Sequence, residues 1–272
     1  MKKIPKKKLG NLLNNLYNQF NFKEYIRRDP IEFLHKYKNP KDIEVVGLIS
    51  SSIAYGRIDL FKPVIRNILE IMGNSPSQYV LTFSPKRELI KFQKWKYRMT
   101  CGVDIACLIH AMQKALQEYG TLKQMFYSFY QKSHTDIEKA LTQMTKYFCS
   151  IDATPIYGKN IYPRGYSFLF PVPLKGSPCK RLNLFLRWMV RGGDGVDLGI
   201  WNKIPSSKLI IPLDVHISRA ANYLSLSNMK SPSWNMAREV TKALKEIDPD
   251  DPVRFDFSLC HLTMSGKLPK YF

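Results

Sequence analysis

The chain has 272 residues, 44% hydrophobic side chains and a formal net charge of +20. This is enough apolar material for one large or two small folded domains. The positive charge exceeds what solubility needs and favours a polyanionic partner, with nucleic acid ahead of a membrane surface. No apolar run approaches the ~20 residues of a spanning helix, and the N-terminus lacks the features of a signal peptide. We therefore expect a soluble cytoplasmic protein without a membrane partner.

The spacing of cysteine and histidine gives no sign of a cofactor. The five cysteines, at positions 101, 107, 149, 179 and 260, are odd in number and never form a C-x-x-C pair. That argues against a disulfide framework, a zinc site or an iron–sulfur cluster. The five histidines are dispersed, and no P-loop or G-x-G-x-x-G pattern occurs. We expect reduced thiols and neither a metal nor a nucleotide cofactor.

A basic helix is expected over residues 1–20. Apolar residues recur at helical spacing from Leu9 through Leu16 to Phe20. Lysines gather at its beginning, namely Lys2, Lys3, Lys6, Lys7 and Lys8. A short basic run is either a solvated tail or a contact with a nucleic-acid backbone, and both interpretations stay open.

Helix signals continue to residue 149. Starts are marked by Asp29-Pro30, by Asp59 ahead of Pro63, and by capping-box patterns at Thr121 and Thr135. Gly73 and Gly120 fit helix ends. Apolar segments run over 43–55, 60–72, 104–119, 122–130 and 136–149, with little strict alternation. The pattern predicts an all-α protein without an internal repeat.

The sequence changes character in residues 150–179, where prolines and aromatics replace helical periodicity. We expect a long irregular loop, of the kind that is often functional. No acidic residue occurs from 153 to 193. The likeliest surface for a nucleic-acid backbone is therefore formed by Arg164, Lys175, Gly176, Arg181, Arg187 and Arg191.

Lys180 and Asp214 each begin a segment with helical periodicity. On the first helix, Lys180, Arg187 and Arg191 share a face opposite the apolar stripe. A lysine in the first turn opposes the helix dipole, and together with Arg181 the dipole favours the neutral, nucleophilic amine. Lys180 could instead merely touch phosphate or solvent. Asp214 could simply cap its helix, although a capping aspartate can also be catalytic if one oxygen faces a cleft.

A family resemblance rests on these segments. Residues 213–219, L-D-V-H-I-S-R, followed by L-S-L at 224–226, resemble the aspartate signature of the helix-hairpin-helix (HhH-GPD) DNA glycosylases. G-S-P-C-K at 176–180 is similar to the hairpin of their bifunctional members, and the spacing is closest to the archaeal 8-oxoguanine glycosylases. The whole chain also resembles a bacterial family of unknown function through R-W-M-V-R, V-D-L-G-x-W, I-P-L-D-x-H and D-P-D-D-P at 187, 196, 211 and 248.

Two features of the sequence depart from the glycosylase pattern. Pro178 replaces the second hairpin glycine and removes a backbone N–H from the usual phosphate-binding nest. The cysteines that hold an iron–sulfur cluster in endonuclease III are absent, as they are in the archaeal branch. Neither departure involves the catalytic lysine or aspartate.

The resemblance implies an all-α, two-lobed helix-hairpin-helix glycosylase fold in residues 21–272, with a hairpin and catalytic segment at 176–226. It implies that Lys180 attacks C1′ of a flipped nucleotide while Asp214 stabilises the developing positive charge. The expected activity is a DNA glycosylase with AP lyase action on an oxidised purine, most simply 8-oxoguanine, in double-stranded DNA. We expect a monomer.

Other site residues follow from the same hypothesis. Candidates for the base pocket are Tyr166, Phe168, Trp201 and Phe257, whereas Trp188 is expected in the core. We expect a packing or hydrogen-bonding role for His216 and not an acid–base role. We also expect an ion pair from Arg219 to Asp248, Asp250 or Asp251. Two alternatives stay open. One is a non-enzymatic DNA- or RNA-binding protein on the same fold, and the other is a basic scaffold that binds RNA or a protein.

Overall fold

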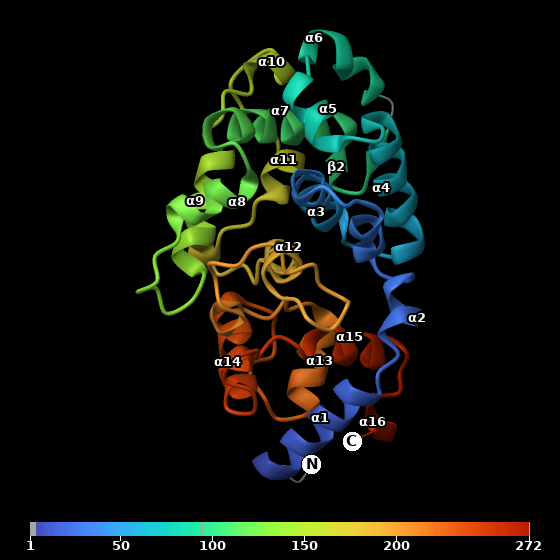
Figure 1. Ribbon diagram of the computed structural model, residues 1–272, viewed down its shortest axis with the longest axis vertical. Helices are drawn as coiled ribbons and strands as arrows, with labels where there is room; N and C mark the ends of the chain where they lie inside the picture. Colours follow the sequence, from blue (N-terminus) through green and yellow to red (C-terminus); the bar gives the residue numbers. More distant parts are fainter. Residues whose placement is uncertain (1–3, 94, 272) are drawn as a thin grey trace. The chain divides into compact units, whose positions relative to one another are not determined.

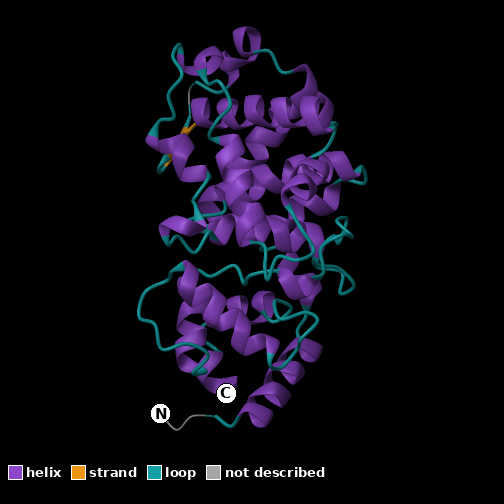
Figure 2. Cartoon of the chain, turned by 90° about the vertical axis from the view of Figure 1, so that its left-hand side faces the viewer, coloured by secondary structure: helices purple, strands orange, loops and turns teal. Residues whose placement is uncertain are grey.

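The computed structural model of the protein describes residues 4–93 and 95–271 and is predominantly helical (Figure 2). The all-α prediction is confirmed at this level. Among the described residues the strands are β1 (Lys96–Tyr97) and β2 (Thr100–Cys101), a short antiparallel pair. Within the same residues no helix is long and apolar enough to cross a membrane. Lys2 and Lys3 of the expected basic helix lie outside the described residues.

The chain divides into two compact units (Figure 1). The first comprises residues 1–29, 135–137 and 173–272, and the second comprises residues 30–134 and 138–172. Each unit combines segments that are distant in the sequence, because the chain leaves the first unit after Asp29 and returns to it for good at Pro173.

The second unit is built around two buried helices, α3 (Pro40–Ile53) and α7 (Gly102–Tyr119). Around them lie η1 (Pro30–Lys36), α4 (Ile58–Met72), α5 (Pro76–Thr82), α6 (Pro85–Glu88), η2 (Leu89–Lys91), α8 (Leu122–Phe129) and α9 (Glu138–Phe148). Helix α3 packs against η1, α4, α5 and α8, so it is buried around almost its whole circumference.

Several of the expected helix ends are confirmed in this unit. Gly73 and Gly120 end α4 and α7 with positive φ angles of 70° and 78°, which glycine adopts without a steric penalty. Thr121 caps α8 by accepting a hydrogen bond from the Gln124 amide at 3.0 Å. Thr135 lies in the first unit, three residues before α9 begins at Glu138.

Residues 150–179 are more regular than the expected loop. They contain the short helices α10 (Thr154–Tyr157) and α11 (Arg164–Leu169) and the turn η3 (Pro173–Lys175). Pro155 and Pro163 lie at the starts of α10 and α11, and Pro173 begins η3, because proline is compatible with the first turn of a helix.

The first unit joins the N-terminal helix to the C-terminal helices. It contains α1 (Lys6–Gln19), α2 (Phe22–Ile26), α12 (Lys180–Val190), η4 (Ser206–Lys208), α13 (Val215–Tyr223), α14 (Trp234–Lys245), α15 (Asp256–Met264) and α16 (Leu268–Tyr271), besides η3. The apolar stripe of α1 is buried at Leu9, Leu13 and Leu16, as its spacing predicts. Arg254 also bonds to Asn14, so α1 contacts the segment that precedes α15 (Figure 1).

Candidate active site at Lys180 and Asp214

A fixed turn positions Lys180 at the first residue of α12. Gly176 (φ +79°) accepts a hydrogen bond at its carbonyl from the Trp234 amide at 3.0 Å. Cys179, the residue before Lys180, is left-handed at φ 48° and ψ 35°, which is unusual outside glycine. The Asn183 side-chain amide donates to the Pro178 carbonyl at 3.1 Å. The turn is therefore held from both sides where the lysine begins.

Asp214 is the N-cap of α13 and uses only one carboxylate oxygen for capping. Its Oδ1 accepts hydrogen bonds from the amides of His216 and Ile217, both at 2.9 Å. The other oxygen, Oδ2, lies 4.0 Å from Nζ of Lys180. Capping and a charged contact with Lys180 thus coexist in one side chain.

The Lys180–Asp214 pair is partly accessible to solvent. The two side chains are 27% and 22% exposed, whereas the remaining residues of α12, from Arg181 to Val190, are all buried. Lys180 is therefore the accessible end of an otherwise buried helix, and solvent reaches both its side chain and that of Asp214.

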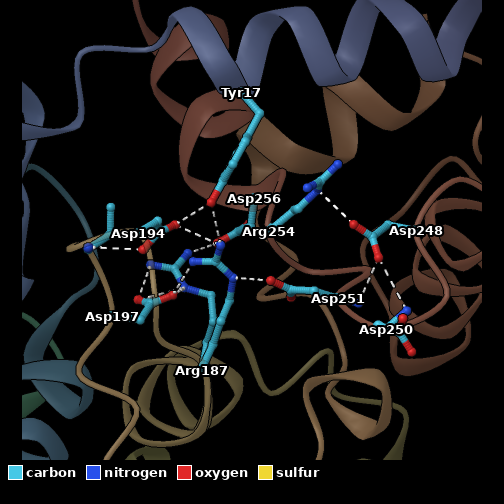
Figure 3. Close-up of polar contacts among 11 residues, drawn as sticks. Tyr17, Arg187, Asp194, Asp197, Asp248, Asp250, Asp251, Arg254 and Asp256 are labelled. Carbon is cyan, nitrogen blue, oxygen red and sulfur yellow. Dashed lines mark hydrogen bonds and ion pairs between the residues drawn. The ribbon is translucent and has the colours of Figure 1, made fainter.

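The basic face expected along α12 is corrected beyond Lys180. Arg187 and Arg191 are only 2% and 3% exposed and lie inside the unit (Figure 3). Arg187 binds Asp197 and Asp256, while Arg191 binds Asp194, Asp197 and Asp251. The helical spacing correctly aligned the two arginines, but carboxylates from later in the chain cover them, so they do not face a DNA backbone.

These side chains form one buried charge network. Arg191 contacts Asp251 Oδ2 at 2.7 Å and the Tyr17 hydroxyl at 3.0 Å, and Tyr17 donates to Asp194 at 2.8 Å (Figure 3). Burial, with Asp194 as acceptor, raises the pKa of Tyr17 to about 12. The network contains two arginines and the four aspartates at 194, 197, 251 and 256, so carboxylates outnumber cations two to one.

Asp256 connects this network to the candidate active site. It is 3% exposed, and burial raises its pKa to about 6 despite the opposing effect of Arg187. Asp214 raises the pKa of the Asp256 carboxyl further, and Lys180 lowers it. Asp256 Oδ1 is buried with no hydrogen-bond partner among the described residues.

The other expected DNA contacts are divided between exposed and buried positions. Lys175 and Gly176 are exposed beside the turn that leads to Lys180, and Arg164 is exposed on α11 of the second unit. Arg181 is 7% exposed, so the neighbour of Lys180 points into the fold. Of the expected DNA contacts, Lys175 and Gly176 are therefore the ones that are exposed in the same unit as the pair.

The expected base-pocket aromatics are mostly core residues. Trp201 (1% exposed) packs edge-on against Phe185, and Tyr166 (0%) donates to the Phe148 carbonyl in the second unit. Phe168, half-buried in the second unit, packs against Tyr55. Phe257 (3%) is buried near Arg187. None of the three buried rings presents a face to a flipped base, and Trp188, at 0%, confirms its expected core position.

The two remaining expectations concern His216 and Arg219. His216 is half-buried, and its Nδ1 is among the buried atoms without a hydrogen-bond partner in the described chain. Arg219 is exposed and does not anchor the acidic turn, because Asp248 pairs with Arg254 at 2.9 Å and Asp251 with Arg191. In the described residues no group of three His, Cys, Asp or Glu side chains could hold a metal ion.

Comparison with known proteins assigns the chain to a family. The family described as a protein of unknown function (DUF2400) matches residues 29–265, and the chain belongs to it. That match covers most of both units, including Lys180 and Asp214. No curated protein and no solved structure matches the chain.

This match corrects the resemblance to the helix-hairpin-helix glycosylase superfamily and its archaeal branch. The family found over residues 29–265 is DUF2400, and no glycosylase family was found. The motif resemblance was local, resting on residues 176–226. Helix capping alone accounts for the aspartate of the signature, because Asp214 is the N-cap of α13.

Asp256 is not among the site residues predicted from the sequence. It is the first residue of α15, four residues after Pro252. Its contact with Arg187 joins residues 69 positions apart. The available signal was the i, i+4 spacing of Asp256 and Cys260, two titratable residues on one helix face.

Proposed function

We propose that the protein is an enzyme in which Lys180 acts as an amine nucleophile and Asp214 as its carboxylate partner. The observation that carries the proposal is the 4.0 Å separation of Lys180 Nζ from Asp214 Oδ2, with Asp214 Oδ1 occupied by capping. The proposal rests on this chemistry and not on kinship with a known repair enzyme.

The activity proposed is that of a DNA glycosylase with AP lyase action. The neutral Lys180 amine attacks C1′, a C–N bond forms, and the damaged base leaves with the electron pair of the glycosidic bond. The ionised Asp214 carboxylate stabilises the positive charge that develops on the sugar, accepts the proton that the attacking nitrogen loses, and passes this proton to the leaving base. Ring opening gives a Schiff base at C1′, and β-elimination then cleaves the strand.

The proposed substrate is an oxidised purine, with 8-oxoguanine tested first, in double-stranded DNA. The net charge of +20 supports a polyanionic partner, and Lys175 and Gly176 offer an exposed approach to the pair. A two-lobed helix-hairpin-helix arrangement, a monomeric state and a cytoplasmic location belong to the same proposal.

Borohydride trapping tests the activity. Duplexes that carry 8-oxoguanine, uracil, an oxidised pyrimidine or an abasic site are incubated with the wild type, Lys180→Gln, Asp214→Asn and Lys175→Gln. The proposal expects a covalent adduct with wild type and Lys175→Gln, none with Lys180→Gln, and a rate reduced at least about 100-fold with Asp214→Asn. Equal trapping by Lys180→Gln and wild type would refute it.

A second candidate function is a non-enzymatic nucleic-acid-binding protein, which the excess positive charge also favours. On that account Lys180→Gln and Lys175→Gln would lose affinity equally, and each would reduce the salt dependence of binding by about one counterion. Retained binding without trapping of any lesion would select this candidate. Lost trapping in Lys180→Gln with retained binding would select the enzyme.

A further inference from the structure

A second basic region of the first unit lies where α1 meets the end of α14. Lys6, the first residue of α1, forms an ion pair with Glu246, the residue that follows α14. One helical turn after Lys6, Gly10 is buried, and a Cβ at this glycine would lie 3.4 Å from the side chain of Ile247. Two separate contacts therefore hold the lysine-rich start of α1 beside the C-terminal end of α14 (Figure 1).

The start of α1 has positive charge that its own helix does not balance. Lys6, Lys7 and Lys8 are all exposed, and the first turn of α1 contains no acidic residue. The helix dipole opposes cations at a helix N-terminus, and adjacent lysines also repel one another. A negatively charged partner at this surface would relieve both effects.

Helix α14 adds a row of cations to the region. Arg238, Lys242 and Lys245 are exposed at i, i+4 and i+7, so they follow one face of the helix over about 10 Å. Together with Thr135 and Ser207 they line an open groove of about 420 Å³. Every residue that lines this groove belongs to the first unit.

Cations outnumber carboxylates two to one in this region. The carboxylates are Glu246, Asp136, which pairs with Arg238 at 3.4 Å, and Glu239, which accepts a hydrogen bond from Ser227. The cations, which we call the α1–α14 basic surface, are Lys6, Lys7, Lys8, Arg238, Lys242 and Lys245.

The surroundings of this surface favour a nucleic acid over a lipid bilayer. Helices that bind membrane surfaces combine cations with exposed apolar side chains that enter the bilayer. Within the described part of the chain, none of the exposed large hydrophobic side chains lies on α1 or α14. Duplex nucleic acid, by contrast, presents one negative charge for about every 1.7 Å of its axis and needs only cations to bind it.

We propose that the α1–α14 basic surface binds the phosphate backbone of a nucleic-acid duplex. Over the ~10 Å of the α14 row a duplex offers about six phosphates, enough for every cation of the row. Phosphate contacts do not read bases, so the surface binds without regard to sequence. The surface is built from residues other than Lys180 and Asp214, and it does not depend on the chemistry proposed for that pair.

The salt dependence of binding tests the surface with two matched variants. Wild type and both variants are titrated with short undamaged DNA and RNA duplexes between about 50 and 200 mM salt. Lys6, Arg238 and Lys245 are kept because they make contacts within the first unit. The surface variant is Lys7→Gln/Lys8→Gln/Lys242→Gln. The control, which removes the same charge from exposed lysines of α2 and of the chain after α15, is Lys23→Gln/Lys267→Gln/Lys270→Gln.

The surface variant is expected to bind a duplex at least about 10-fold more weakly than wild type at 0.1 M salt. The slope of log affinity against log salt should decrease by about two to three counterions, since three phosphate contacts are lost. The control should change the slope by less than about one. A loss on either duplex supports the inference, and the comparison of DNA with RNA identifies which backbone is preferred.

Two results would overturn the inference. One is an equal decrease in slope for the surface variant and the control, which would mean that only net charge matters. The other is binding of wild type to phosphatidylserine vesicles but to neither duplex, which would assign the surface to a membrane. Failure of wild type to trap any lesion would refute the proposed chemistry alone, because this test measures binding to undamaged duplexes.

Discussion

Asp214 shows how one residue serves both structure and chemistry. Oδ1 satisfies two amides at the start of α13, and Oδ2 lies toward Lys180. Capping needs a side-chain oxygen but no charge, whereas stabilising a developing cation needs the charge. Substitutions at this residue can therefore separate the two tasks.

Asp214→Asn keeps an acceptor for the cap and removes the charge. We expect its free energy of unfolding to stay within about 0.5 kcal/mol of wild type, whereas Asp214→Ala loses about 1 kcal/mol. Both variants should lose trapping activity. Urea unfolding measures the stability, and a loss of stability in Asp214→Asn as large as in Asp214→Ala would contradict the assignment of Oδ1 to capping alone.

Arg187 is a structural residue, and its replacement should be costly. Arg187→Ala leaves Asp197 and Asp256 buried without their cation, and removing one partner of a buried ion pair typically costs 3 to 5 kcal/mol, about half of a typical domain stability. The exposed Arg219→Ala should change the free energy of unfolding by less than about 0.5 kcal/mol. Similar unfolding midpoints in urea for these two variants would show that Arg187 is not held as described.

Asp256 also makes stability depend on pH. Burial raises its pKa from 3.8 to about 6 in the folded protein, so the native state binds the extra proton. Its stabilising contribution is fully present below pH 3.8 and is lost as the pH rises through 6. Relative to Asp256→Asn, the wild type should lose about 3 kcal/mol between pH 3 and pH 7.5. Unfolding curves with parallel pH dependence for the two proteins would exclude the shift.

At the scale of elements, the start of α12 stores strain beside Lys180. Cys179 is 1% exposed and left-handed at φ 48°, a conformation that costs a non-glycine residue about 1 to 2 kcal/mol. Such residues persist where the surrounding structure holds them, often at functional sites. The hydrogen bonds of Gly176 and Pro178 supply that support.

Two substitutions of Cys179 separate backbone strain from loss of the thiol. Cys179→Gly accepts a positive φ readily, whereas a β-branched side chain in Cys179→Val does not. We expect the valine variant to be less stable than the glycine variant by about 2 kcal/mol in urea unfolding. Equal stabilities would mean that the left-handed turn is not required for the start of α12.

Local signals predicted individual elements well and their partners poorly. Features that depend on a few neighbouring residues could be predicted from the sequence. They are the apolar stripe of α1, the cap at Thr121 and the glycines that end α4 and α7. The environment of Arg187 is decided by Asp256, 69 residues away. Helical spacing shows which residues share a face but not what covers it, and for this reason the basic face of α12 was placed on the surface.

At the scale of the molecule, the buried network leaves more positive charge on the protein surface, because it buries more carboxylates than arginines. The chain has 42 basic and 22 acidic residues, and four aspartates of the first unit are held against buried arginines. Lys180 and Asp214 were found from the sequence because each begins a helix. Their closeness in space, across 34 positions, depends on the packing of the whole unit.

The most direct test of the account is to locate the covalent bond to DNA. Wild-type protein is trapped with borohydride on a duplex carrying an abasic site, and the adduct is mapped by mass spectrometry after digestion of protein and DNA. The account predicts a reduced sugar remnant on Lys180 and almost none on the exposed Lys175. A remnant spread over exposed lysines, with Lys180 unmodified, would contradict Lys180 as the nucleophile.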